Sequence, residues 1–186
     1  MKSIRNVRGL FMTLSTATLV AMSQPAMAGG SHTGGHDDKG AKKSESGYPG
    51  KASEATRTIT IEMFDTYYEP KVLDLKEGET VRFVVVNKGE LVHEFNIGTK
   101  ASHMAHQPQM MEMMEKGVLE IDRVRHNKMK HGEGGMSHDH PNSALLEPGQ
   151  SAEVVWTFDT DAKLEFACNV PGHYQSGMVG PIKLSH

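Results

Sequence analysis

The 186-residue sequence contains a single cysteine, Cys168, and this scarcity limits what the protein can be. One cysteine cannot form a disulfide within its own chain, so a framework of internal bridges is excluded. Positive charge is not in excess either, since the formal net charge is −3, and a nucleic-acid-binding surface is not indicated. No apolar run reaches the roughly 20 residues that span a bilayer as a helix. The single cysteine therefore needs another explanation.

The N-terminus has the three parts of a secretory signal. Three basic residues open the chain, residues 9–22 form an uncharged and largely apolar run, and Ala26-Met27-Ala28 fits a small-x-small cleavage site. The pattern predicts a cleaved signal peptide at residues 1–28, with an uncleaved anchor as the alternative. We expect a mature chain without a membrane span in a bacterial periplasm. A lone thiol in that oxidising compartment needs burial, a metal or an intermolecular bridge.

Residues 29–55 are rich in Gly, Ser and Lys and have almost no large apolar side chain. Such a segment cannot bury enough surface to offset the entropy of ordering it, so it is interpreted as a flexible tail. The tail carries His32 and His36, which are either weak metal ligands or solubilising residues.

From residue 56 onward the sequence has the pattern of short strands. In TRTITIEM, residues 56–63, apolar side chains alternate with polar ones, as in a half-buried strand. Turn signals at Glu77-Gly78 and Pro148-Gly149 separate further runs of this kind. Other strands are expected within residues 72–75, 80–87, 90–98, 145–158, 163–169 and 179–184. The pattern predicts an all-β domain at residues 56–186, built as an antiparallel sandwich or barrel.

An insertion at about residues 99–143 interrupts the strands. Its length makes a structureless loop improbable in a compact domain, so we expect it to be partly helical. Pro108 is predicted at the first position of a helix that Gly117 ends. Residues 118–130 are interpreted as a second short helix or a strand, and residues 131–141 as a loop rich in Gly and His.

Soft and intermediate metal ligands are concentrated in CNVPGHYQSGM, residues 168–178. Cys168, His173 and Met178 follow one another at short spacing on one predicted loop between two strands, and His93 lies in a strand-like run far upstream. Two imidazoles, one thiolate and a weak axial thioether are the ligands of blue-copper electron-transfer sites. Zinc is the second choice, because zinc sites rarely use thioether sulfur.

The segment FACNVPGHYQSGMVG, residues 166–180, resembles the C-terminal copper loop of cupredoxins, the type 1 copper proteins. Its spacing is similar to that of rusticyanin-like and oxidase-domain members, and LVHEFNIG, residues 91–98, resembles their upstream histidine strand. The resemblance implies a Greek-key β-sandwich of seven or eight strands with one copper near one end. It also implies that the equatorial ligands are His93, Cys168 and His173, and that the axial ligand is Met178.

Two further expectations rest on this resemblance. The family's equivalent of His173 passes electrons at the surface, so a redox partner protein is expected to dock near it. Glu94 stands where members often carry Asn or Ser, the neighbour that joins the two ligand loops by hydrogen bonds. A carboxylate there either adds negative charge near copper or points outward.

The insertion is enriched in histidine and methionine, with six and seven of them respectively within residues 103–140. Thioethers favour Cu(I), and imidazoles bind both oxidation states, so this segment is a candidate for additional copper. The alternatives are that Met packs a short helix onto the sheet and that the loop is merely solvated. The possible secondary ligands are His103, His106, Met110, Met114, His131, Met136, His138 and His140.

These features favour a copper-tolerance or copper-handling cupredoxin with one-electron redox capability. A diffusible electron carrier of a respiratory or photosynthetic chain is the alternative, because it needs only the type 1 site. An enzyme such as a multicopper oxidase domain is disfavoured. Its trinuclear centre needs several His-x-His pairs, and the sequence offers one, at His138 and His140.

Overall fold

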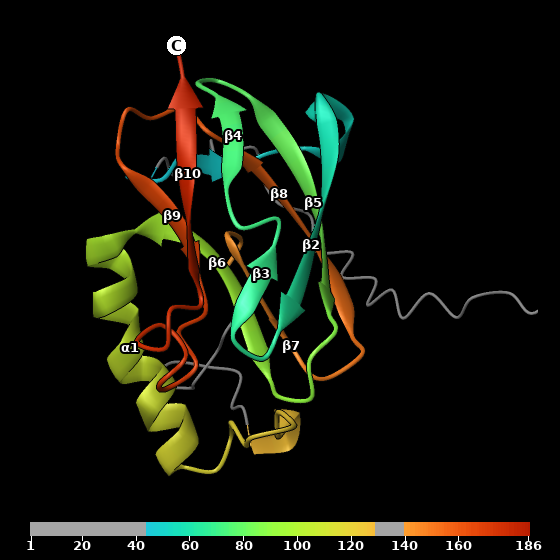
Figure 1. Ribbon diagram of the computed structural model, residues 1–186, viewed down its shortest axis with the longest axis vertical. Helices are drawn as coiled ribbons and strands as arrows, with labels where there is room; N and C mark the ends of the chain where they lie inside the picture. The colour runs from blue at the N-terminus through green and yellow to red at the C-terminus, as the bar shows by residue number, and fades with distance from the viewer. Residues whose placement is uncertain (1–43, 129–139) are drawn as a thin grey trace, which may run out of the picture. The chain divides into compact units, whose positions relative to one another are not determined.

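A computed structural model describes residues 44–128 and 140–186, which form two packed β-sheets and one helix (Figure 1). The all-β prediction is confirmed. The first sheet has the order β1-β8-β5-β2-β3, with the bounds β1 Tyr48–Pro49, β8 Ser151–Thr157, β5 Thr80–Asn87, β2 Arg57–Phe64 and β3 Tyr67–Glu69. The second has the order β4-β10-β9-β6-β7, with the bounds β4 Leu73–Lys76, β10 Val179–Ser185, β9 Leu164–Ala167, β6 His93–Thr99 and β7 Ser143–Leu146.

The sandwich differs from the expected one in two respects. The structure has ten strands where seven or eight were expected, because it adds two very short ones, β1 and β3. It is also not purely antiparallel, since β2 pairs in parallel with β5, and β10 with β4. Strands β4 and β5, consecutive in the chain, lie in different sheets. The Glu77-Gly78 turn between them, with Gly78 at φ 75°, carries the chain across.

The core lies between the two sheets. The alternation on β5 places Val81, Phe83 and Val85 inward, each fully buried. Phe83 packs with Phe95 of β6, with 5.4 Å between the ring centroids. Because β6 is buried along almost its whole length, its sequence does not alternate as β5 does.

Helix α1, Lys100–Glu115, covers the outer side of the second sheet against β6 and β9 (Figure 1). It begins eight residues before the predicted position of its first turn, so placing Pro108 at N1 was wrong. Thr99 caps the helix by accepting a hydrogen bond from the Ser102 N–H, and Pro108 lies inside on the exposed side, where water can satisfy the freed carbonyl. Gly117, at φ 62°, follows the helix end as predicted.

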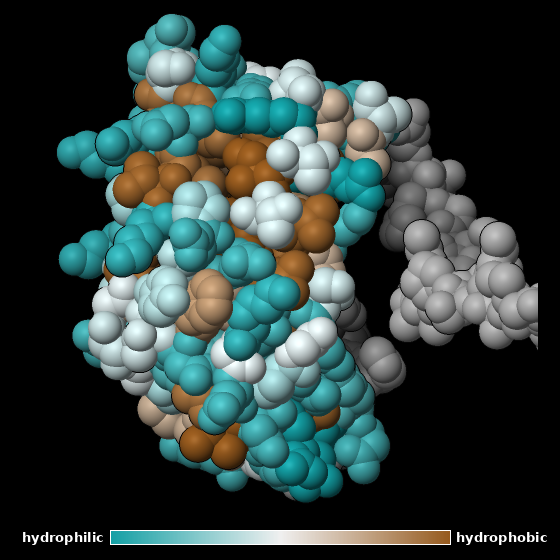
Figure 2. All heavy atoms as spheres, turned by 45° about the vertical axis from the view of Figure 1, so that its right-hand side comes forward, coloured by the Kyte–Doolittle hydropathy of each residue, from teal (hydrophilic) through white to brown (hydrophobic). Residues whose placement is uncertain are grey.

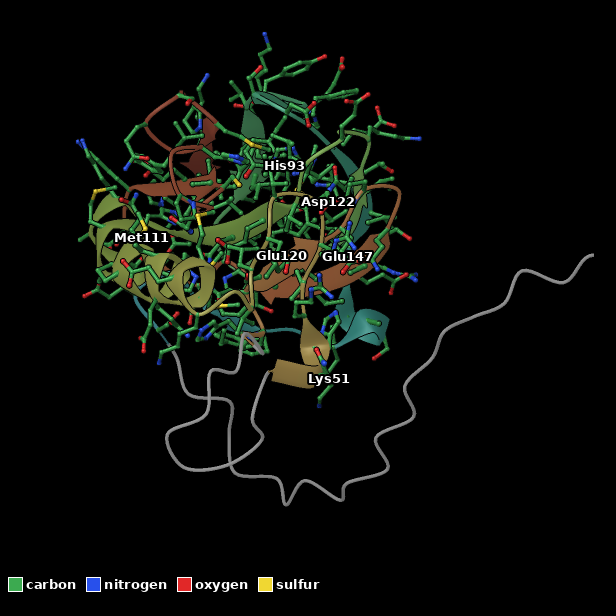
Figure 3. The ribbon with its side chains drawn as sticks, turned by 90° about the horizontal axis from the view of Figure 1, so that it is seen from below. Lys51, His93, Met111, Glu120, Asp122 and Glu147 are labelled. Carbon is green, nitrogen blue, oxygen red and sulfur yellow. The ribbon has the colours of Figure 1, made fainter. Side chains whose placement is uncertain are left out.

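The segment after α1 is neither the second α-helix nor the regular strand that was considered. Leu119 and Val124 form an isolated antiparallel bridge, followed by the 3-10 helix η2, His126–Lys128. The Val124 N–H donates to the Glu147 carboxylate at 2.8 Å, which attaches this segment to the turn between β7 and β8. Figure 3 shows Glu120, Asp122 and Glu147 on the same side of the molecule.

The domain includes residues before residue 56. Strand β1 pairs with β8, and the Trp156 indole donates to the Ser46 carbonyl at 2.8 Å, so part of the expected tail lies against the domain. A short 3-10 helix, η1, Ala52–Glu54, leads into β2. Across the described ranges, no helix has the length and apolar character needed to cross a membrane. Figure 2 shows a mainly hydrophilic face on which apolar residues gather in separate patches.

Candidate metal centre

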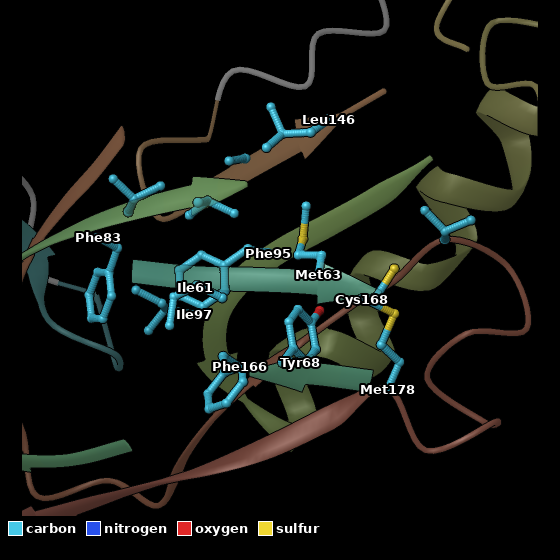
Figure 4. Close-up of a cluster of buried hydrophobic side chains, with 14 of the residues drawn as sticks. Ile61, Met63, Tyr68, Phe83, Phe95, Ile97, Leu146, Phe166, Cys168 and Met178 are labelled. Atoms are coloured by element: carbon cyan, nitrogen blue, oxygen red, sulfur yellow. The ribbon is translucent and has the colours of Figure 1, made fainter. Parts of the chain in front are cut away.

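Strand pairing places His93 and Cys168 at the same edge of the second sheet. Strands β6 and β9 run antiparallel, with Asn96 opposite Ala167. His93 is the first residue of β6, and Cys168 directly follows the last residue of β9, so both lie at one end of the sandwich. Both side chains are fully buried there. Figure 4 shows Cys168 at the end of the hydrophobic core.

The loop after Cys168 folds back on itself through backbone hydrogen bonds. The His173 N–H donates to the Val170 carbonyl, and the Met178 N–H donates to the His173 carbonyl, each at 3.0 Å. The Cys168 N–H then donates to the Met178 carbonyl at 3.1 Å and closes the loop. Gly177, at φ 95°, takes a left-handed conformation that other residues rarely adopt. The loop thus returns Met178 to the position of Cys168.

Three donor atoms converge at this end. One atom each from His93, Cys168 and His173 lie within 4.8 Å of one another. The Cys168 sulfur is 3.9 Å from His93 Nδ1 and 3.3 Å from His173 Nδ1. A metal about 2.3 Å from a thiolate and about 2.0 Å from an imidazole would separate sulfur and nitrogen by about 3.5–3.7 Å. The donor set therefore fits a single ion without large movement.

Met178 is the fourth residue predicted from the sequence, and it lies beside this group. Its side chain is fully buried, and its backbone is bonded to that of Cys168. Figure 4 shows the sulfur-bearing side chains of Cys168 and Met178 at the same end of the core. The arrangement is suited to a thioether that approaches the three other donors.

The protonation of the donors suits a metal ligand set. Burial raises the pKa of the Cys168 thiol to about 12, so in the metal-free protein this group is a neutral thiol. Burial, together with the nearby His93, lowers the pKa of His173 to about 4. Burial also lowers the pKa of His93, although the Asp65 carboxylate opposes that shift. Both imidazoles are therefore neutral at neutral pH, and only the thiol must lose a proton to bind metal.

Asp65, which the sequence analysis did not single out, orients His93. The Asp65 Oδ1 atom is 3.1 Å from His93 Nε2 and also accepts from the backbone N–H groups of Glu90 and Leu91. With the Nε2 proton directed to Asp65, Nδ1 is left facing Cys168. A side chain at Gly89 would collide with this pair, since a Cβ there would lie 2.3 Å from Asp65 Oδ1. Local sequence carries no signal of this contact, because it depends on how the β2–β3 turn meets the loop before β6.

Glu94 points inward and is completely buried. Its backbone N–H donates to the Cys168 sulfur at 3.3 Å, and its carboxylate accepts from the backbone N–H of Asn169 at 3.2 Å. Glu94 therefore joins the two ligand segments, the role that the resemblance implied for an Asn or Ser at this position. Of the two alternatives left open for its side chain, the outward orientation is excluded.

The histidines of α1 contact this network. His103 Nδ1 is 3.2 Å from Asn169 Nδ2, and its Nε2 lies 3.5 Å from the Glu165 carbonyl. His106 Nε2 is 3.2 Å from the Glu94 carboxylate. Burial alone would lower the pKa of His106, but the hydrogen bond and charge of Glu94 outweigh it and raise that pKa.

The remaining possible secondary ligands do not form one cluster among the described residues. Met110 is fully buried in the hydrophobic core, in line with the packing alternative, whereas the Met114 side chain is exposed. His140 lies beside His106, with 5.4 Å between the ring centroids. Figure 3 labels Met111, which is exposed on α1. His131, Met136 and His138 lie outside the described residues.

Two proteins described as copper-resistant cuproproteins share much of this sequence. The chain is 48% identical over 145 residues to the copper-resistant cuproprotein CopI of Pseudomonas aeruginosa, covering 73% of this chain and 80% of that protein. It is 36% identical to the protein of the same name from Rubrivivax gelatinosus, covering 91% of this chain and 92% of that one.

Solved structures share the fold at low sequence identity. Auracyanin B superposes with a TM-score of 0.53 at 18% identity, covering 71% of this chain and 91% of that chain. Reduced auracyanin of Roseiflexus castenholzii superposes with a TM-score of 0.52 at 19% identity, covering 71% and 99% of the two chains. A family model described as a cupredoxin-like domain matches residues 41–121. From these matches and from the two-sheet sandwich described above, the chain belongs to the cupredoxin-like family.

Proposed function

We propose that this protein is a periplasmic copper-tolerance cupredoxin that holds one copper in a type 1-like site. The equatorial ligands are His93, Cys168 and His173, and the axial ligand is Met178. The observation that carries the proposal is the convergence of one thiol and two neutral imidazoles within 4.8 Å at a buried end of the sandwich. The N-terminal secretory pattern supports an exported chain.

Copper bound there would supply one-electron chemistry, because thiolate and thioether accommodate Cu(I) while imidazoles accommodate Cu(II). The chain's own residues provide the surroundings for that chemistry. Asp65 fixes the orientation of His93, and Glu94 donates its backbone N–H to the Cys168 sulfur. Burial of Cys168 protects the thiol from oxidation.

The tolerance role is supported by the names of the relatives, which are described as copper-resistant cuproproteins. It is tested by growth of a strain lacking the gene in medium with excess copper. We expect impaired growth, restored by the wild-type gene and not by one encoding Cys168→Ala. Normal growth of the deletion strain in copper would contradict the tolerance role.

An electron carrier of a respiratory or photosynthetic chain is the second candidate. It is favoured by the half-buried position of His173 on the ligand loop, which gives a partner protein access to one ligand. We propose that such a partner docks on the surface around His173. A deletion strain with normal copper tolerance and a respiratory or photosynthetic defect would support this candidate over the first.

Additional copper in the insertion distinguishes the two roles further. Because His103 and Met110 are buried in the fold, deleting residues 103–140 would damage the domain. A variant with His131→Ser, Met136→Ser and His138→Ser changes only candidate ligands outside the described residues. For copper handling we expect this variant to bind fewer coppers per chain than the wild type while keeping the type 1 spectrum. An unchanged stoichiometry of one copper in both proteins would count against the handling role.

A further inference from the structure

Among the described residues, the Glu94 carboxylate is the most heavily hydrogen-bonded buried group at the metal end. Its Oε2 atom accepts from the backbone N–H of Asn169 at 3.2 Å and from the Asn169 side chain at 2.9 Å. Its Oε1 atom accepts from the Ser143 hydroxyl at 2.7 Å and the Asn96 amide at 3.1 Å, and lies 3.2 Å from His106 Nε2. These donors come from α1, β6, β7 and the ligand loop. A buried carboxylate is tolerated when it is satisfied in this way.

Both histidines of α1 have both ring nitrogens engaged. His106 contacts Glu94 through Nε2 and Gln109 through Nδ1, at 3.2 Å each. His103 contacts Asn169 through Nδ1 and the Glu165 carbonyl through Nε2. Neither ring therefore offers a nitrogen lone pair to a metal without losing an existing contact. The geometry indicates that these histidines have a role other than the copper binding considered for them above.

The role of the two α1 histidines follows from the residues that they contact. Asn169 is the residue next to Cys168, and Glu94 is next to His93 and bonded to the Cys168 sulfur through its N–H. The helix thus reaches both ligand segments, through His106 to Glu94 and through His103 to Asn169. Loss of either contact would leave the loop that carries Cys168 with fewer restraints.

We propose that Glu94 couples helix α1 to the metal centre, and that His106 is a positioning residue that holds Glu94, and through it Cys168, in place. The proposal rests on the assignment of Cys168 as a copper ligand. It makes the helical part of the insertion a structural component of the site, in addition to any role in holding copper.

The test compares His106→Ala with His106→Gln and with Glu112→Gln. Glu112 lies on the exposed side of the same helix, where it pairs with Lys116, and is outside the network. In the metal-free full-length protein, we expect Cys168 of His106→Ala to react with a thiol reagent at least about tenfold faster than in the wild type, the lower limit of the factor for losing one hydrogen bond to a charged group. His106→Gln retains a donor and should recover much of the protection, and Glu112→Gln should match the wild type.

The copper-loaded proteins provide a second measurement. His106→Ala should shift the reduction potential and the thiolate-to-copper absorption band, whereas Glu112→Gln should change neither. Thiol reactivity, potential and spectrum all equal to those of the wild type would overturn the coupling. If His106→Ala does not fold, the comparison of His106→Gln with Ser143→Ala decides, because Ser143→Ala removes another donor to Oε1 and should expose the thiol more. Absence of any absorption band in the wild type would instead refute the type 1 site, and the thiol measurement would still test the coupling.

Discussion

At the scale of single residues, the candidate site is defined by groups whose protonation depends on burial. The Cys168 thiol has a pKa raised to about 12, and His173 has one lowered to about 4. Both directions favour the uncharged form, as expected for groups removed from water. The metal-free pocket is therefore neutral at the ligands themselves, and binding a metal must remove a proton from sulfur.

The raised pKa of the Cys168 thiol predicts that a proton is released when a metal binds. At about pH 7, redox-inert Zn²⁺ should displace about one proton per chain more from the wild type than from Cys168→Ala, since the imidazoles are already neutral. Because this proton must be released, affinity should already decline as the pH falls from neutral, and it should decline more steeply below about pH 4, where His173 becomes protonated. Calorimetry in buffers of different ionisation enthalpy measures the released protons. Equal release from the two proteins would show that the thiol is not a ligand.

A second prediction concerns Met178. Because an axial thioether bond is long and weak, Met178→Leu should keep one copper bound and raise or lower the reduction potential without abolishing the thiolate band. Leucine conserves most of the buried volume at this fully buried position, so the fold should tolerate it. Metal analysis and voltammetry of the variant measure both quantities. Complete loss of copper would argue against an axial role for Met178.

At the scale of elements, sequence patterns predicted what depends on local residues. Alternation identified β2 and β5, and Gly117 marked the helix end. The helix start was misjudged, because Pro108 resembles a first-turn residue, whereas the Thr99 cap lies nine residues before the assumed start. Contacts such as that of Asp65 with His93 could not be predicted, because they join segments that meet only in the folded sandwich.

At the end of the sandwich remote from the proposed metal ligands, a separate set of hydrogen bonds links neighbouring elements. Glu79, in the turn before β5, accepts from the Arg57 guanidinium at 2.8 Å and from the Lys76 N–H at 3.0 Å. Burial opposes its ionisation, but these hydrogen bonds outweigh that effect and lower the pKa of Glu79. Since the folded pKa is below the unfolded one, the stabilisation is present above about pH 4.3 and is lost as the pH falls through the folded value.

Glu79→Gln should therefore lower the free energy of unfolding by about 1 kcal/mol at neutral pH, a value reduced by the partial exposure of Arg57. The difference from the wild type should shrink towards zero at about pH 3 or below. Urea unfolding at the two pH values provides the measurement. Glu153→Gln is the control, because its partner Arg82 and Glu153 itself are both well exposed, and we expect almost no effect. A pH-independent loss in Glu79→Gln would refute the electrostatic explanation.

At the scale of the whole molecule, the protein joins a cupredoxin-like sandwich to an insertion whose helix packs against the sheet that carries His93. The four proposed ligands could be singled out from the sequence because three of them lie within residues 168–178 and the fourth lies in a strand of matching pattern. The contacts made by both ring nitrogens of each α1 histidine could not be predicted from the sequence. Composition alone does not distinguish a metal ligand from a buried hydrogen-bonding residue.

The central claim is that Cys168 binds copper as a thiolate in a type 1-like site. The most direct test is the visible spectrum of the copper-loaded full-length protein beside that of Cys168→Ala, with copper content measured in both. We predict an intense thiolate-to-copper absorption band in the wild type and its complete loss in the variant, whether or not copper remains bound elsewhere. An unchanged spectrum in Cys168→Ala would contradict the account.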